Sequence, residues 1–367
     1  MEFWSDRDRL VEERDKICFT LLDQFFQDEW QFADAWKLIA GVRYWKDDRE
    51  GGYFGTAPEV PFLSAPVTII FNKHEVSPLG SSVTPGDATH SFDGVTARVQ
   101  LDWKPTDDLL WYLSYNRGSK SGGYTFSTGT PYDPDGSQDT PRAFLEGLSF
   151  KPETLDAYEL GMKSTLGSTT TLNVSAFYYD YTDYQAFAQV GPIQTVINLD
   201  ANETGLEAEL TSRPLDGLTL QLGLSFLDST VKNVPLPDGA YVAQGTIEDH
   251  DLPQAPAVSG NALARYEFNL AGGSLGLQAD VQYSDKFCFT VLCAPVEQED
   301  SYTVANARVS YDGGGGHWGV AAFVNNMFEE KYRVYAFDSS LFAGVVAGVY
   351  AKPRTWGFSA TYRFGGL

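Results

Sequence analysis

The strongest constraint on the fold is a two-residue period of apolar side chains that recurs along the chain. In residues 217–226 every second residue is leucine or phenylalanine, and threonine, glutamine, glycine and serine lie between them. Successive side chains of a β-strand point to opposite faces, so this pattern gives each strand one apolar and one polar face. We therefore predict an all-β protein, with an apolar face in this segment made of Leu218, Leu220, Leu222, Leu224 and Phe226.

The length of the alternating segments favours a membrane-spanning sheet over a soluble one. Strands of soluble proteins have a typical length of about 5–6 residues, whereas membrane-spanning strands need about 9–11 residues and run tilted. About thirteen alternating segments of roughly 9–13 residues each can be found, near residues 17–28, 35–46, 92–104, 108–118, 155–165, 171–184, 203–213, 217–231, 256–269, 274–287, 301–311, 316–326 and 354–364.

The connections between these segments alternate in length. The short ones combine Gly, Asp, Asn and Pro, as tight hairpins do. The long ones are residues 47–91, 119–154, 185–202, 232–255, 288–300 and 327–353. Outer-membrane barrels show this asymmetry, with short periplasmic turns and long external loops. We predict an antiparallel transmembrane β-barrel portion of about 13–14 meandering strands.

The lipid environment explains why a sheet of this kind closes. Every backbone N–H and C=O in lipid must be bonded internally, so only helices and closed barrels span a membrane. Complete bacterial barrels have an even number of strands. An odd count that begins with a descending strand predicts that residues 17–367 form the C-terminal part of a larger barrel. Residues 1–16 are then expected in an external loop or a non-native segment.

Composition excludes several classes of function. The formal net charge is −23, whereas nucleic-acid binding needs a basic face, so we expect no nucleic-acid partner. No apolar run approaches the ~20 residues of a membrane helix, and no signal peptide is visible. The sequence has no Walker loop, Rossmann fingerprint, H-E-x-x-H or G-x-S-x-G motif. We therefore predict no catalytic residues, no metal site and no cofactor.

Two of the three cysteines, Cys288 and Cys293, lie close together between two alternating segments. A local disulfide in an oxidising compartment and a pair of free thiols are both compatible with that spacing. Cys18 has no obvious partner.

Several stretches in combination resemble one family, the TonB-dependent outer-membrane receptors of the iron-complex or siderophore type. Residues 102–124 resemble its strand–turn–strand followed by an Arg-Gly-x-Lys-x-Gly-Gly stretch, and residues 172–185 its strand with paired tyrosines. Similar matches cover residues 150–166, 203–229 and 306–333. Trp356, Phe358, Tyr362 and Phe364, in the last alternating segment, resemble the C-terminal signal for membrane assembly.

The resemblance implies energy-coupled import of a scarce nutrient, most simply a ferric siderophore or another iron complex, across the outer membrane of a Gram-negative bacterium. It implies outer-membrane lipid, the barrel assembly machinery and the small ligand as partners. It also implies contact with the TonB energy-coupling complex through an N-terminal region. The family has a signal peptide and a plug domain, and neither can be found in this sequence.

Four residues at the entry to the loop of residues 119–154 are candidates for ligand binding, and we expect them to lie beside the lumen: Arg117, Lys120, Tyr124 and Phe126. Ferric siderophores are often anionic and aromatic, so cations beside aromatic rings would suit them through charge and stacking. The alternative is that these side chains pack the loop and the strand end.

Two other interpretations remain open. A plug-less, porin-like or substrate-specific channel would need a complete even-stranded barrel. A soluble β-rich protein that binds or processes glycans would have to leave the stripe from Leu218 to Phe226 as a large exposed apolar patch.

Overall fold

The structure is a computed structural model of the 367-residue chain. It describes residues 19–51, 88–124, 149–190, 193–235, 246–247, 249–340 and 344–364. Within these ranges the chain is almost entirely β-structure, with two short 3-10 turns, η1 (Pro295–Glu297) and η2 (Gly314–Gly316). No helix in the described part of the chain is long and apolar enough to cross a membrane.

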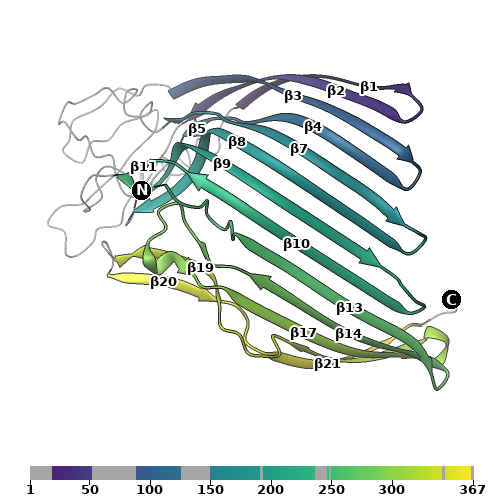
Figure 1. Ribbon diagram of the computed structural model, residues 1–367. Coiled ribbons are helices and arrows are strands. Elements are labelled where there is room, and N and C mark those ends of the chain that lie inside the picture. The colour runs from purple at the N-terminus through teal and green to yellow at the C-terminus, as the bar shows by residue number, and fades with distance from the viewer. Residues whose placement is uncertain are drawn as a thin grey trace, which may run out of the picture.

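One antiparallel sheet of 13 strands dominates the fold and curves like part of a barrel wall (Figure 1). Each strand pairs with the next main strand along the chain, which is a meander. The all-β, antiparallel prediction is confirmed. In sheet order the strands are β1 (Phe19–Ala33), β2 (Trp36–Gly51), β3 (Ala88–Thr106), β4 (Leu109–Lys120), β7 (Glu153–Leu166), β8 (Thr170–Val190), β9 (Ile193–Ser212), β10 (Leu218–Val231), β13 (Val258–Leu270), β14 (Gly273–Ser284), β17 (Tyr302–Gly313), β18 (Trp318–Asn325) and β21 (Thr355–Tyr362).

The two ends of the sheet differ in their connections. Short hairpins such as those between β1 and β2 or β13 and β14 gather at the end where the C-terminus lies, which we call the turn end (Figure 1). Chain reversals there use left-handed glycines where the backbone demands them, as at Gly272 with φ 79°. The longer connections gather at the opposite end, which we call the loop end.

Among the described residues the sheet has two free edges, because β1 and β21 each pair with one neighbour and not with each other. All main-sheet pairs are antiparallel, and β1 and β21 are the first and thirteenth strands. Both edge strands therefore run in the same direction, from the loop end to the turn end.

Four small two-stranded sheets lie at the loop end. They are β5 (Gly123–Tyr124) with β6 (Ser149–Phe150), β11 (Val234–Pro235) with β12 (Thr246–Ile247), β15 (Phe287–Cys288) with β16 (Gln298–Glu299), and β19 (Arg333–Ser339) with β20 (Val345–Tyr350).

Every predicted long connection contains some strand residues, and two of them depart furthest from the prediction. Residues 185–202 form a hairpin arm in which β8 and β9 continue past the rest of the sheet, joined at Val190↔Ile193. Residues 327–353 contain the β19–β20 hairpin. The arm also alternates, since Ala186 and Ala188 are buried while Phe187 is 51% exposed. The sequence does not show this pattern clearly, because alanine is only weakly apolar. In addition, the strand is interrupted at Asp183, whose φ is 54°.

Candidate functional site

One face of the sheet carries a belt of exposed aliphatic side chains, and we call it the apolar face. Leucines 38, 101, 113 and 160 pair in one row across β2, β3, β4 and β7. On β10, Leu222, Leu224 and Phe226 are 40, 39 and 49% exposed. A row of this kind would be an aggregation hazard in water, whereas lipid is its natural solvent.

Aromatic rings border this aliphatic belt. Near the turn end Trp36 stacks on Trp103 with ring centroids 5.7 Å apart. Nearer the loop end, Tyr158 packs between Tyr115 and Tyr178 at 5.1 and 6.4 Å. Amphipathic rings of this type favour the interface between hydrocarbon and water.

The last strand presents its aromatic residues on the free edge of the sheet. Trp356, Phe358, Tyr362 and Phe364 are 73, 77, 60 and 89% exposed. The two-residue period predicted for this strand is present, because Trp356 pairs with Val324 and Phe358 with Ala322 on the apolar face. Their role as an assembly signal stays a prediction.

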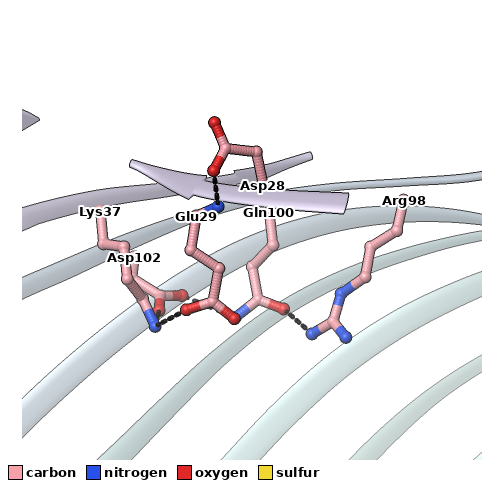
Figure 2. A network of polar contacts seen from close by, with 6 residues as sticks. All are labelled: Asp28, Glu29, Lys37, Arg98, Gln100 and Asp102. Carbon is pink, nitrogen blue, oxygen red and sulfur yellow. Dashed lines mark hydrogen bonds and ion pairs between the residues drawn. The ribbon is translucent and has the colours of Figure 1, made fainter. Parts of the chain in front are cut away.

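The opposite, polar face carries hydrogen-bonded networks of charged side chains. In Figure 2 the Lys37 ammonium lies between Glu29 and Asp102, 3.3 and 3.5 Å from their carboxylate oxygens. Gln100 donates to Asp102 at 2.6 Å and accepts from Arg98 at 2.6 Å. These five side chains reach to one side of the sheet, while Asp28 lies on the other and accepts from the Glu29 backbone (Figure 2). Half of each strand is thus suited to a wet or filled interior.

A depression of about 220 Å³ lies in the wall where β9, β10, β13 and β14 meet. Its polar lining is Glu207, Glu209, Ser225, Ser259, Asn261 and Gln282. Within the described residues, neither glutamate has an ion-pair partner, so this part of the polar face is net acidic.

The structure places two of the four candidate ligand residues, Arg117 and Lys120, on opposite faces of β4. Arg117 lies on the apolar face beyond Tyr115, where Asp156 accepts from its guanidinium at 2.5 and 2.8 Å. Lys120 lies three residues further on β4, opposite Glu153, and is exposed. The backbone of Tyr124 is in β5, and Phe126 lies outside the described residues. Ligand binding by these residues stays a prediction. The predicted location beside the lumen is wrong for Arg117, because this side chain lies on the apolar face.

A polar clamp at the loop end joins β4, β7 and the β8–β9 arm. Gln185 Nε2 donates to the carbonyl oxygens of Ser121 and Lys151 at 2.9 and 3.1 Å. Asn198 Nδ2 donates to Lys151 O and Asp183 O at 3.1 and 2.8 Å, and Asn198 Oδ1 accepts from Lys151 N. Two amide side chains therefore fix three neighbouring segments to one another.

A hydrophobic core at the loop end packs the arm against later loops. It is made of Ala186, Ala188, Leu199, Ala201, Val231, Val234, Leu252 and Val291. Tyr184 lies against this core, and its burial raises the pKa of its hydroxyl, with smaller contributions from the carboxylates of Glu153 and Glu203. The tyrosine is therefore neutral at physiological pH.

The loop that supplies Val291 is closed by a disulfide between Cys288 and Cys293, whose Cα atoms are 5.2 Å apart. Buried Glu297 holds the same loop by accepting from Thr290 Oγ1 at 2.6 Å, Ala294 N at 3.2 Å and Asp338 N at 2.9 Å. We call this loop, with β19–β20 and the arm, the cap.

Arg333 ties the β19–β20 hairpin to the disulfide loop. Its Nε donates to Glu299 Oε2 at 2.6 Å, and its Nη1 donates to Val296 O at 2.8 Å. Sequence reasoning missed Glu297 and Arg333, because an isolated charge in a predicted loop gives no sign that it is buried or paired.

The described residues contain no group of three or more His, Cys, Asp or Glu side chains placed to hold a metal ion. What the geometry offers is a polar interior, an apolar exterior with aromatic borders, and a packed cap at one end. This combination defines the class of protein: part of the wall of an antiparallel β-barrel whose outer surface is suited to lipid.

The family assignment agrees with this class. The TonB-dependent receptor-like β-barrel family matches residues 12–327, and the chain belongs to that family. The family and its structural neighbours are receptors and transporters, and the family is found in the outer membranes of Gram-negative bacteria.

Solved structures share the fold at low sequence identity. The ferric yersiniabactin uptake receptor FyuA from Yersinia pestis matches with a TM-score of 0.69 and 18% identity, over 93% of this chain and 45% of that one. The siderophore receptor PiuA from Acinetobacter baumannii gives 0.67 and 19%, over 93% and 42%. The copper transporter OprC gives 0.65 and 14%, over 94% and 48%. The chain therefore spans less than half the length of each of these structures.

Proposed function

We propose that this chain forms the C-terminal part of the barrel of a TonB-dependent receptor that imports a scarce nutrient through the bacterial outer membrane. The observation that carries the proposal is the family match over residues 12–327 on a sheet with one apolar and one polar face. The chain acts in transport and performs no catalysis. Its partners are outer-membrane lipid, the barrel assembly machinery and, through the N-terminal part of a complete receptor, the TonB complex.

The proposed cargo is a ferric siderophore or another iron complex. FyuA and PiuA are described as a ferric yersiniabactin uptake receptor and a siderophore receptor, which supports this class of ligand. OprC, a copper transporter, supports the wider class of metal uptake. Lys120, at the loop end of β4, and Tyr124, whose backbone is in β5, remain candidates for ligand contact. Arg117 and Phe126 remain candidates on sequence grounds.

Uptake of radioactive iron tests this function in the source bacterium. We expect inactivation of the full gene to abolish energy-dependent uptake of at least one member of a panel of ferric chelates. A protonophore should abolish the same uptake, since energy coupling distinguishes a TonB-dependent receptor from a passive channel. Uptake that persists with the protonophore but is lost with the gene would favour the porin-like alternative. Unchanged uptake of every iron and copper complex tested would refute import of a metal complex.

A further inference from the structure

A strap of three residues, Ser121–Gly123, covers part of the polar face at the loop end of β2 and β3. A Cβ atom added to Gly122 would lie 2.5 Å from both the Phe150 carbonyl oxygen and Cε1 of Phe92. Both glycines of the strap are buried. The strap therefore sits directly on the side chains below it, and only glycine permits that approach.

Three buried polar side-chain atoms in this region have no hydrogen-bond partner in the described part of the chain: Trp45 Nε1 and Asp47 Oδ1 on β2, and Ser121 Oγ in the strap. Asp47 pairs with Phe92, whose ring lies directly against Gly122. Trp45 and Asp47 are each only 5% exposed, and they lie two residues apart on the polar face of β2. The other Asp47 oxygen accepts from Arg49 at 2.7 Å, which balances its charge. A buried polar atom without a partner costs free energy that exposure to water would return.

Within the described residues, the hydrogen bonds that hold the strap come from the β8–β9 arm and from β6. Gln185 Nε2 donates to Ser121 O at 2.9 Å, and β5 and β6 pair over only two residues. Gln185 belongs to the β8–β9 arm, and the arm packs into the core of the cap. A displacement of the cap would therefore act on the strap through the Gln185 side chain.

We propose that Ser121–Gly123 is a lid over a latent binding subsite, and that the lid opens to offer Trp45 Nε1–H and Asp47 Oδ1 to a neutral hydroxyl-bearing ligand. The closed form leaves a donor and an acceptor unpaired, so it is easily opened. A hydroxyl group accepts from an indole N–H and donates to a carboxylate oxygen, so a ligand with hydroxyl groups supplies a partner for each atom without bringing a net charge. The role of this ligand in transport rests on the proposed function, whereas the lid and its binding do not.

The rate of backbone amide hydrogen exchange in residues 119–124 reports how often the lid opens. We would measure it by mass spectrometry on the complete receptor reconstituted in a membrane. Trp45→Phe keeps the ring and removes the unpaired N–H, so exchange should become about tenfold slower, which corresponds to ~1.4 kcal/mol. Gly122→Ala should abolish protection, because its Cβ cannot fit under the closed strap. Gly118→Ala is the matched control, since nothing lies within 4 Å of its added Cβ, and it should leave exchange unchanged.

D-glucose serves as the neutral polyol probe of the subsite. It should accelerate exchange in the native strap, because a ligand of the open form shifts the population towards it, and it should do so much less in Trp45→Phe. Without sugar, amide exchange in Trp45→Phe that is as fast as in the native protein, or faster, would refute the proposal that the unpaired Trp45 N–H destabilises a closed lid. An identical response of both proteins to glucose would overturn the hydroxyl subsite. Neither readout uses iron uptake, so a failure here is distinguishable from a failure of the proposed function.

Discussion

An arginine placed on either face of β10 gives the sharpest test of the two-faced sheet. Leu222 is the middle member of the five-residue apolar stripe, 40% exposed, and it pairs with Leu210 and Ala262. Its neighbour Gln221 points to the polar face, where it pairs with Thr211 and Leu263. Leu222→Arg and Gln221→Arg therefore add the same charge at the same depth of the wall, on opposite sides.

The expected difference is large because only one of the two arginines must enter hydrocarbon. At the bilayer midplane a lipid-facing arginine costs about 2–4 kcal/mol. That cost corresponds to roughly 30- to 900-fold in the folding equilibrium. We expect Gln221→Arg to cost about 1 kcal/mol or less, since its side chain reaches water or the neighbouring polar groups.

Folding of the complete receptor, carrying either change, into lipid vesicles measures both costs in one system when tryptophan fluorescence is followed during a denaturant titration, because only a closed barrel spans the bilayer. Repeating the titration in detergent supplies a control, because a micelle deforms more easily around a buried charge. Equal costs at the two positions in lipid vesicles would refute the assignment of faces. A larger cost for Gln221→Arg would mean that the sheet is inverted with respect to lipid.

Three further predictions test the cap and the last strand. Joint replacement of Cys288 and Cys293 by alanine should destabilise the cap by about 2 kcal/mol, which is measured as faster proteolysis of residues 286–299. An unchanged rate of proteolysis would mean that the disulfide does not stabilise this loop. Glu297→Gln should cost about 1–3 kcal/mol in the same assay, since it sets an amide N–H₂ against buried donors, whereas the exposed Glu329→Gln should cost almost nothing. Phe364→Ala should lower the membrane-assembled fraction severalfold by heat-modifiable gel mobility, and normal assembly would remove the terminal aromatics from the assembly signal.

The alternating period predicted the sheet because the same physical cause acts on every strand. A strand with lipid on one side and a polar interior on the other must alternate, so segments such as Leu218–Phe226 are visible without neighbours. The strand ends near the turns follow equally well, because glycine, asparagine and aspartate are required there by backbone geometry.

The loop end was harder to predict because its structure depends on contacts between distant segments. Ala186 and Ala188 are buried by Val231 and Val291, which lie 43 or more residues further along the chain. Glu297 looks like a solvated charge until Thr290 and Asp338 are seen to bond it. The face on which Arg117 lies likewise depends on the strand register, in which Arg117 pairs with Asp156. A shift of one residue in the register would move its side chain to the opposite face of the sheet.

The shared direction of β1 and β21 limits how a wall containing this sheet can be completed. Strand directions must alternate around a closed antiparallel ring, and both free edges here descend towards the turn end. Joining the edges directly, or adding a second copy in the same membrane orientation, would force parallel contacts. Any antiparallel closure must therefore insert an odd number of strands whose first and last members ascend. Counting strand directions at two edges thus decides which partners can complete the pore.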